Sequence, residues 1–549
     1  MQQVLLALLL LYSSTLFSQK NLSLSSEAIT NILYQHASDD SPGIALGIVK
    51  DGKVVYEQYL GYANLEYEIA IDPATHFNIA SNAKQFTALC VLTLAEKGKL
   101  SLEDDFRTYL PGFYPSIEDR ISLANLIAHT SGIRDISYLW GLQGKSWWKL
   151  FVDNDDAIEL LRAQRDLNFR PGTDYLYSNS NYILLAEIVR VVTGQEFSDY
   201  AKVLFEELDM PSTHFRTNYG AIIPSKARPY GNWGGWQEEP SITETHGDGG
   251  LFTTLADQLK WEQIIQLNDG SYLSPKLIEQ SQSPIEKGYG YGVMFDTYLG
   301  LAYRYHDGST GAYQATYLRF PTRNLSIVLL TNNRSVPTNY AAWQIASSLL
   351  ELEETEEEQK VYAAKPDQVE AVKNLSALLG NYSNEEGTVI RITEKEGTLY
   401  REMYQRDPVA LIPEKGGLFE YGEERFQGLK INFTNIGKSN QEFTLYRSSL
   451  PPATYQKVSD LSFNGFEKRE LNGRFYNDET DTEIILKYRE GDTYSLIKNG
   501  KERPAKLILG DYLRMMDYYE IRIIRDEDRQ VIGLKVDNDR IRSVKFEKR

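Results

Sequence analysis

Cysteine is almost absent from this chain, whose 549 residues include only Cys90. A single cysteine forms no disulfide within the chain, and no cysteine lies near residue 20 to carry a lipid. Cys90 lies in an apolar run, so we expect it to pack in the core. The six histidines are scattered, and neither His-x-x-x-His nor Cys-x-x-Cys spacing occurs. We therefore expect no metal site and no cofactor.

Basic residues are in deficit. The chain has 58 Lys and Arg against 76 Asp and Glu, which gives a net charge of −18. Such a charge disfavours binding to nucleic acid and to anionic membrane surfaces. We therefore expect neither as a partner, and a small-molecule or peptide substrate, possibly derived from peptidoglycan, remains open. The sequence gives no indication of the oligomeric state.

A hydrophobic run from Val4 to Leu11 lies near the N-terminus and is too short to span a bilayer comfortably. Small and polar residues follow it. We expect residues 1–18 to be a signal peptide, so that the mature protein is periplasmic or secreted and has no membrane span. The alternative is an uncleaved anchor, because no Lys or Arg precedes the run and Leu16 stands where a smaller residue is usual.

The hydrophobic content of 42% is enough for two or more globular domains. Residues 351–368 begin with a run rich in glutamate, typical of a solvated linker. Beyond it the chain shows short alternating strands, and the segment around Gly380 is echoed around Gly473, 93 residues later. We expect two tandem β-barrel-like domains at 369–458 and 467–549. They follow a larger domain at 25–350.

The stretch from Phe77 to Phe86 places a hydroxyl and an amine three residues apart at the start of an apolar helix. Ser81 and Lys84 would share one helix face, so the lysine would reach the hydroxyl. Burial lowers the pKa of a lysine, which can then serve as the base for a serine nucleophile. The N–H of Ser81 would stabilise an oxyanion. The alternative is an N-cap serine followed by a surface lysine.

A second motif lies in a polar loop ahead of a predicted helix from Ile183 to Val192. Tyr177 and Asn179 are two residues apart and would point into one cleft. The alternative is a hydrogen-bonded turn in which Asn179 or Ser180 caps the helix.

Two further segments are ambiguous. His129 lies in a predicted last helical turn, which we expect Gly132 to end. It is a candidate base, but a histidine there is more often a capping or packing group. The glycine-rich turn from His246 to Gly250 lacks the lysine of a phosphate-binding loop, and we interpret it as structural.

A third motif lies on the segment from Ala302 to Gly311, which we expect to be an edge strand of an antiparallel sheet. Alternate side chains of a strand share a face, so Arg304 and His306 would lie together. Gly308 would let a substrate backbone lie close.

Ser81-x-x-Lys84, Tyr177-x-Asn179 and His306-x-Gly308, in this order, resemble the three active-site motifs of the serine penicillin-recognising enzymes, which include class C β-lactamases and DD-peptidases. Segments 126–132 and 249–254 are also similar to this family. The resemblance implies an α+β fold over residues 25–350, in which helices flank an antiparallel sheet beside a helical subdomain. The two small all-β barrel-like domains then strengthen the comparison with D-aminopeptidase.

The resemblance implies roles for each position. Ser81 would be the acylated nucleophile, Lys84 its base or charge partner, and Tyr177 the proton relay to the leaving group. Asn179 would hold the substrate amide, and the N–H of Ser309, beside Gly308, would complete the oxyanion hole with that of Ser81. The predicted site residues therefore comprise a catalytic set (Ser81, Lys84 and Tyr177) and a substrate-binding set (Asn179, His306, Gly308, Ser309 and Arg304).

His306 stands where β-lactamases usually carry lysine, a departure that resembles certain DD-carboxypeptidases and D-aminopeptidases. We therefore expect a serine hydrolase that forms an acyl-enzyme on amide bonds, with D-peptides or β-lactam-like molecules as substrates. One alternative is a carboxylesterase of the same fold. The other is a non-catalytic binding or sensor protein.

Overall fold

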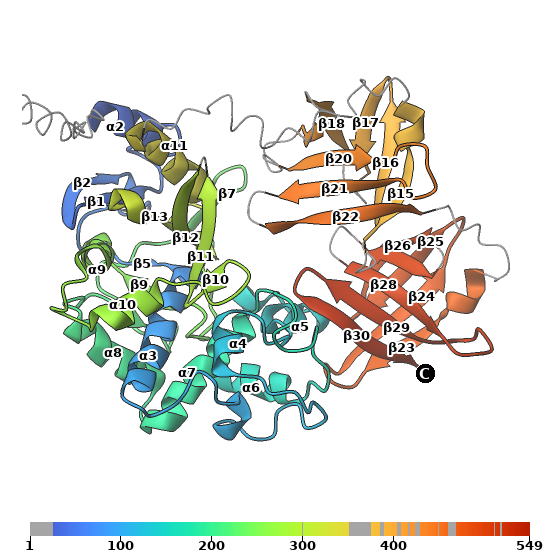
Figure 1. Ribbon diagram of the computed structural model, residues 1–549, viewed down its shortest axis with the longest axis horizontal. Coiled ribbons are helices and arrows are strands. Elements are labelled where there is room, and N and C mark those ends of the chain that lie inside the picture. The colour runs from blue at the N-terminus through green and yellow to red at the C-terminus, as the bar shows by residue number, and fades with distance from the viewer. Residues whose placement is uncertain are drawn as a thin grey trace, which may run out of the picture.

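The computed structural model describes residues 26–298, 300–350, 375–384, 389–402, 408–414, 418–422, 429–447, 450–458, 468–509, 511–515 and 519–549. The predicted signal peptide, residues 1–18, and the predicted acidic linker, residues 351–368, lie outside these ranges. The described chain forms an N-terminal part, residues 26–350, and two barrels (Figure 1).

An antiparallel sheet of seven strands organises the N-terminal part, in the order β10-β11-β12-β13-β14-β1-β2. Its strands are β1 (Ile44–Lys50), β2 (Lys53–Leu60), β10 (Tyr289–Gly290), β11 (Val293–Tyr298), β12 (Leu301–Thr310), β13 (Tyr313–Phe320) and β14 (Leu325–Thr331). A turn at Asp51 and Gly52 joins β1 and β2. The prediction that 302–311 is an edge strand was wrong, because β11 pairs with the outer side of β12.

Helices cover both faces of the sheet. On one face α2 (Ser26–Tyr34) and α11 (Thr338–Leu350) share a buried cluster with strand residues such as Leu46 and Leu329. On the other face α9 (Leu255–Leu267) packs against β1 and β14. An added Cβ at Gly47 would lie 2.6 Å from the Leu259 methyl groups, so glycine allows this close packing.

Helix α3 (Lys84–Glu96) is the centre of the helical subdomain, and almost every one of its residues is buried. It follows the short 3₁₀ helix η1 (Ala80–Ala83) and packs against α7, α8 and α10. Its apolar residues, Cys90 among them, explain the burial. The other helices are α4 (Leu123–Ile127), α5 (Ile136–Leu142), α6 (Asn154–Arg162), α7 (Asn179–Thr193), α8 (Phe197–Glu207) and α10 (Pro275–Ser281).

Short strands complete this part of the chain. They are β3 (Tyr62–Asn64), β4 (Ile69–Ala70), β5 (Phe77–Asn78), β6 (His214–Phe215), β7 (Tyr230–Asn232), β8 (Trp236–Glu238) and β9 (Leu251–Thr253). Strand β9 pairs with both β5 and β6, which ties the segment before Ser81 to the glycine-rich turn that precedes Leu251.

Two closed antiparallel barrels follow. Barrel 1 comprises β15 (Gly380–Ser383), β16 (Val389–Lys395), β17 (Thr398–Arg401), β18 (Val409–Pro413), β19 (Leu418–Tyr421), β20 (Lys430–Thr434), β21 (Glu442–Arg447) and β22 (Leu450–Val458). Barrel 2 comprises β23 (Gly473–Asn477), β24 (Thr482–Tyr488), β25 (Thr493–Lys498), β26 (Lys501–Leu509), β27 (Tyr512–Met515), β28 (Tyr519–Arg525), β29 (Val531–Asn538) and β30 (Ile541–Lys548). The predicted fold class, an α+β domain followed by two barrels, is confirmed.

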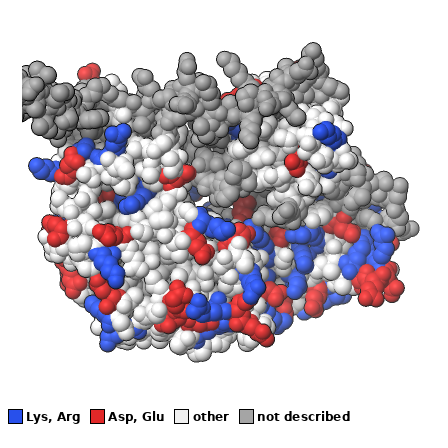
Figure 2. All heavy atoms as spheres, viewed as in Figure 1, with Lys and Arg blue, Asp and Glu red and all other residues white. Residues whose placement is uncertain are grey.

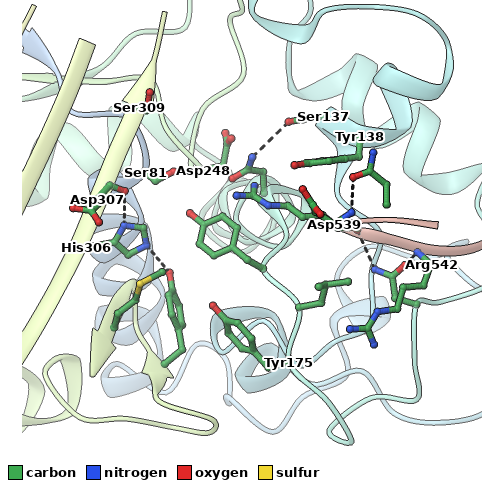
Figure 3. Close-up of a pocket in the computed structure, with 18 of the residues that line it drawn as sticks. Ser81, Ser137, Tyr138, Tyr175, Asp248, His306, Asp307, Ser309, Asp539 and Arg542 are labelled. Carbon is green, nitrogen blue, oxygen red and sulfur yellow. Dashed lines mark hydrogen bonds between the residues drawn. The ribbon is translucent and has the colours of Figure 1, made fainter. Parts of the chain in front are cut away.

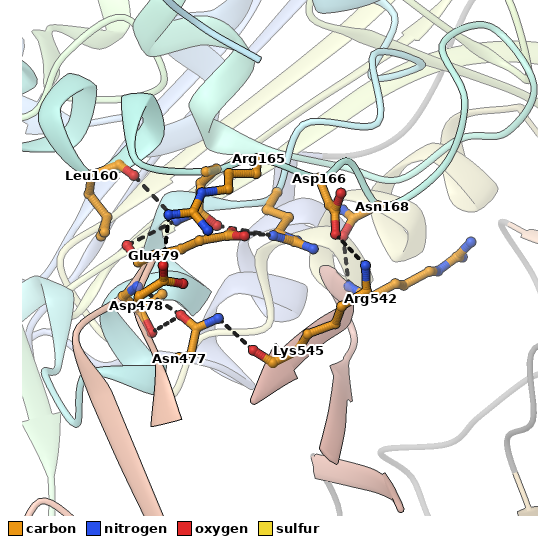
Figure 4. A network of polar contacts seen from close by, with 12 residues as sticks. Leu160, Arg165, Asp166, Asn168, Asn477, Asp478, Glu479, Arg542 and Lys545 are labelled. Carbon is orange, nitrogen blue, oxygen red and sulfur yellow. Dashed lines mark hydrogen bonds and ion pairs between the residues drawn. The ribbon is translucent and has the colours of Figure 1, made fainter. Parts of the chain in front are cut away.

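Barrel 2 is docked on the helical subdomain (Figures 1 and 4). Arg134 and Glu479 form an ion pair at 3.0 Å, with side chains 1% and 11% exposed. Further pairs join Arg165 to Asp478 and Asp166 to Lys545. The apolar interior of barrel 2 belongs to the same buried cluster as the helical core. The two units therefore form one continuous body.

Charged side chains of both signs are interspersed over the face shown in Figure 2, on the N-terminal part and on barrel 2 alike. No helix among the residues that the structure describes is long and apolar enough to cross a membrane.

Candidate active site

Ser81 lies in η1, between β5 and α3. The residue before it, Ala80, has a φ of +48°, a left-handed conformation that alanine rarely adopts. The Asn78 side chain accepts a hydrogen bond from the Ala80 N–H at 2.9 Å and supports this turn. The serine is thereby fixed at the start of the buried helix, as the sequence predicted.

Lys84 donates hydrogen bonds to three oxygens: Ser81 Oγ at 3.1 Å, Asn179 Oδ1 at 2.9 Å and the Asp248 carbonyl at 2.6 Å. Burial lowers the pKa of Lys84 to about 7, and the nearby Asp248 carboxyl opposes this shift. The Lys84 ammonium therefore gives up a proton more readily than that of an ordinary lysine. Lys84 lies where it can take the Ser81 proton.

Tyr177 lies over Lys84, whose Nζ is 4.9 Å from the centre of the tyrosine ring. Burial raises the pKa of Tyr177, so the phenol keeps its proton at neutral pH. His129 packs against this ring with centroids 4.3 Å apart, and its Nδ1 accepts hydrogen bonds from Ser178 N and Asn181 Nδ2. His129 thus has a packing position under Tyr177, outside the reach of Ser81. Helix α4 ends at Ile127, earlier than predicted from Gly132.

Asn179 is the first residue of α7, and Ser178 occupies the N-cap position that the alternative interpretation gave to Asn179 or Ser180. The side-chain oxygen of Asn179 accepts a hydrogen bond from Lys84, so only the NH₂ group of Asn179 remains to face a substrate. That group lies 3.5 Å from Ser137 Oγ (Figure 3). The buried Asp135 carboxylate accepts from the Asn179 backbone N–H at 2.8 Å and holds the start of the helix.

His306 is held by both ring nitrogens. Nδ1 donates to the Asp307 carbonyl at 2.8 Å, which leaves Nε2 to accept from the Tyr289 hydroxyl at 3.1 Å (Figure 3). Burial lowers the pKa of His306 to about 3, and the charge of Lys84 lowers it further. The imidazole is therefore neutral, and both its nitrogens are occupied.

Gly308 brings β12 against the segment that carries the nucleophile. An added Cβ at this position would lie 2.2 Å from the Ile79 carbonyl oxygen. The glycine is needed for contact between two protein backbones, whereas the sequence predicted close approach of a substrate. This contact sets Ser309 near Ser81, on the same cavity wall.

Arg304 departs from the predicted arrangement. Its guanidinium lies over the Phe295 ring at 5.8 Å, and it is not among the residues that line the cavity around Ser81. Arg304 and His306 do lie on the same face of β12, as predicted. Arg304 is two residues further from Ser81 along the strand, and this displacement places it outside the cavity.

The cavity that contains Ser81 has a volume of about 2160 Å³ and extends between the N-terminal part and both barrels. Of the predicted residues, it is lined by Ser81, Tyr177, Asn179, His306, Gly308 and Ser309. Lys84 lies behind Ser81 and contacts it directly. The three motifs therefore meet at one site, and the roles assigned to them stay predictions.

The turn between β29 and β30 of barrel 2 forms one wall of this cavity. The Arg540 guanidinium lies 4.6 Å from the centre of the Tyr177 ring and 5.6 Å from that of Tyr138. Arg540 Nη1 is 3.5 Å from the Asp135 carboxylate, whose side chain is fully buried. Arg540 thus covers the site from the barrel side.

Sequence reasoning missed Asp135, Tyr289 and Arg540, and it treated Asp248 as part of a structural turn. Asp248 gives no distinct signal, because aspartate is an ordinary residue of glycine-rich turns. Arg540 has none, since it comes from a different domain. Within the described residues, no group of three or more His, Cys, Asp or Glu side chains is arranged to hold a metal ion.

The arrangement provides a serine nucleophile, a lysine base, a protonated tyrosine and backbone N–H groups of Ser81 and Ser309 for a developing oxyanion. These groups together support acyl transfer to the serine. None of them requires a cofactor.

Comparison with known proteins agrees with this geometry. A D-aminopeptidase of Cereibacter sphaeroides (strain KD131) is 25% identical over 474 residues, which cover 83% of each chain. The protein flp of Staphylococcus aureus (strain MRSA252) is 30% identical over 320 residues, 54% of this chain and 60% of that protein.

Among solved structures, the octameric penicillin-binding protein homologue from Pyrococcus abyssi superposes with a TM-score of 0.56 at 23% identity. The match covers 78% of this chain and 99% of that one. The D-amino acid amidase from Ochrobactrum anthropi SV3 has a TM-score of 0.50 at 19% identity and covers 60% and 99% of the two chains. These likenesses show the fold. Residues 31–350, which hold all three motifs, match the family described as Beta-lactamase, and the chain therefore belongs to this family of serine hydrolases.

Proposed function

We propose that this protein hydrolyses the amide bond that follows an N-terminal D-amino acid in short peptides or amides. Lys84 takes the Ser81 proton as Ser81 Oγ attacks the carbonyl carbon, and the N–H groups of Ser81 and Ser309 stabilise the oxyanion. Tyr177 donates its proton to the departing amine and is reprotonated by the Lys84 ammonium, which leaves Lys84 free to accept a proton from the attacking water. Water then attacks the acyl-enzyme and releases the acid.

His306 is the observation that carries this proposal. At the position on β12 where β-lactamases carry lysine, this chain has a neutral imidazole whose two nitrogens bond Asp307 and Tyr289. A neutral, fully bonded ring offers no charge to a substrate carboxylate at this position. This favours substrates that need no carboxylate contact at this position, and relatives named D-aminopeptidase agree with it.

The wall that barrel 2 adds supports short substrates. Arg540 and its neighbours occupy space in front of Tyr177 that an open cleft would leave to a longer chain. The natural source of such substrates would include peptides released from peptidoglycan.

Labelling and turnover test the proposal. The protein is incubated with a fluorophosphonate, and peptide mass mapping should find the label on Ser81. D-Ala-p-nitroanilide should be hydrolysed faster than its L-enantiomer, with Ser81→Ala as the inactive control. Absence of both labelling and turnover would contradict the proposal. An effect of the purified protein that persists after Ser81→Ala would also contradict it and would favour a binding protein. Turnover of nitrophenyl esters alone would establish the esterase alternative.

We also propose that the protein acts in the periplasm or outside the cell. The apolar run from Val4 to Leu11 and the small and polar residues that follow it support this location. N-terminal sequencing of protein recovered from cell fractions tests it. We expect cleavage near Ser18, and an intact N-terminus in the cytoplasmic fraction would contradict the proposal.

A further inference from the structure

Asp248 lies on the glycine-rich turn directly beside the nucleophile (Figure 3). Its backbone carbonyl accepts from Lys84 Nζ at 2.6 Å, and the carbonyl of the preceding Gly247 accepts from Thr87 Oγ1 at 2.7 Å. Both donors belong to α3, the helix that follows Ser81. The turn is therefore fixed to the catalytic helix, and the Asp248 side chain has a defined position relative to Ser81.

Within the described residues, the carboxyl group of Asp248 has no side-chain hydrogen-bond partner, and only the backbone N–H groups of Asp248 and Gly249 approach it. Its Oδ1 atom is buried without a hydrogen-bond partner, and no ion pair reaches the side chain from the described residues. Burial raises the pKa of Asp248 to about 6. An unpaired carboxylate in a buried place is unfavourable unless a cation or donor joins it.

Lys84 does not fill this role in the resting site. An ammonium has three N–H donors, and those of Lys84 are taken by Ser81 Oγ, Asn179 Oδ1 and the carbonyl oxygen of Asp248. The carboxylate oxygens of Asp248 receive none of them. The Asp248 carboxylate therefore interacts with Lys84 through charge alone, and its oxygens can still accept hydrogen bonds from a ligand in the cavity.

We propose that Asp248 binds the α-ammonium group of the substrate residue that becomes attached to Ser81. The inference rests on the proposed function and adds the residue that recognises the free amine. The α-nitrogen is about 2.5 Å from the carbonyl carbon of its own residue, given standard bond lengths. Once Ser81 Oγ attacks that carbon, the ammonium lies a few ångströms from the nucleophile, in the region where Asp248 stands.

Two other carboxylates near the site are less suited to this role. Asp135 already accepts from the N–H groups of Ser137 and Asn179 and faces Arg540. Asp539 stands next to Arg540 on the barrel 2 turn, and that charge lowers its pKa against the effect of burial. Asp248 is the carboxylate fixed to the catalytic helix, and it has no such neighbouring arginine.

Binding to the Ser81→Ala protein tests this inference without depending on turnover. Isothermal titration at pH 7 compares D-Ala-p-nitroanilide, whose amine is charged, with propionyl-p-nitroanilide, which lacks the amine. We expect the aminated ligand to bind about 10- to 100-fold more tightly, the effect of a charge-assisted hydrogen bond. Adding Asp248→Asn should abolish this difference, and Asp248→Glu should retain part of it.

Equal binding of the two ligands to Ser81→Ala would overturn the inference. So would a preference that survives Asp248→Asn, or one that Asp539→Asn removes in its place. Turnover by the Ser81-containing protein reports separately on the proposed function. In that protein, Asp248→Asn should lower the ratio of kcat/KM for the aminated over the propionyl substrate at least tenfold. This ratio is insensitive to effects on Lys84, which serves both substrates.

Discussion

Lys84 determines the pH range in which Ser81 can be activated. Burial lowers its pKa to about 7, and a base must be unprotonated to accept a proton. We therefore predict that kcat/KM for an uncharged amide or ester rises with pH through about 7 and then levels off. The rate profile from pH 5 to 9 checks this.

His306 provides the control for this profile. Its pKa of about 3 keeps His306 neutral from pH 5 to 9, so His306 does not cause the rise of kcat/KM on the acid side of the profile. This rise should stay near pH 7 in the His306→Asn protein. If the rise near pH 7 disappears in His306→Asn, the ionisation that controls kcat/KM belongs to His306 and not to Lys84.

Tyr289 fixes the imidazole that the proposed function depends on. Tyr289→Phe would leave His306 Nε2 buried without a donor, which costs about 1–3 kcal/mol of the free energy of unfolding. We predict a lower Tm and about a tenfold fall in kcat/KM. Tyr291→Phe is the matched control. The Tyr291 hydroxyl accepts a 3.0 Å hydrogen bond from Gln280 Nε2, and Tyr291 does not line the cavity. Equal effects of the two substitutions would show that the loss is not specific to His306.

At the scale of elements, the contact between β12 and η1 holds the two halves of the oxyanion site together. Gly308→Ala would place a methyl group 2.2 Å from the Ile79 carbonyl and force the strand away from the nucleophile. We predict a loss of about 100-fold or more in kcat, as expected when an oxyanion donor is displaced. A kinetic comparison with Gly220→Ala is the control, because this exposed glycine has no positive φ and its Cβ would meet only the end of the Asn218 side chain, at 3.2 Å. Full activity of Gly308→Ala would disprove the contact.

The local elements were the part of the fold that sequence could predict. The helix after Ser81 is apolar nearly all round, so its burial followed from composition, and the pairing of Ser81 with Lys84 followed from helical periodicity. The position of β12 inside the sheet did not follow. The strands outside it, β10 and β11, come directly before it in the chain and pair across short connections, Gly290 with Val293 and Tyr298 with Leu301, which the sequence analysis did not recognise as hairpins.

At the scale of the whole molecule, barrel 2 is held by a buried charge pair. Glu479→Gln would leave Arg134, 1% exposed, without its ionic partner, at a cost of about 3 kcal/mol. We predict a lower first transition in calorimetry and faster proteolysis between the barrels and the N-terminal part. Asp478→Asn, next in sequence, is the control. Its pair with Arg165 is largely exposed and should contribute about 0–1 kcal/mol. A similar fall in the transition temperature for Glu479→Gln and Asp478→Asn would contradict the prediction.

Arg540 is predicted to limit substrate size. Arg540→Ala would clear the space over the Tyr177 ring, while Asp135 keeps its two backbone donors. We expect longer acyl groups and a bulky fluorescent penicillin to react faster with Ser81 than in the unsubstituted protein, relative to D-Ala-p-nitroanilide. An unchanged ratio would show that barrel 2 does not shield the site.

From the sequence alone, barrels that shape the cleft could not be told apart from independent modules on a linker. The reason is physical. Arg134 and Glu479 are 345 positions apart, and each alone has the appearance of an ordinary surface charge. Only the packed structure shows that the two side chains meet in a buried place.

The barrel wall also has a consequence for the order of assembly. Barrel 2 closes when β30 pairs with β23, and the turn that bears Arg540 immediately precedes β30. Domains tend to fold in the order of their synthesis. Ser81 and Lys84 would therefore be in place while the nascent chain still lacks its last wall. During that interval large molecules can reach Ser81. The site excludes large substrates only after β30 has paired with β23 and closed the barrel.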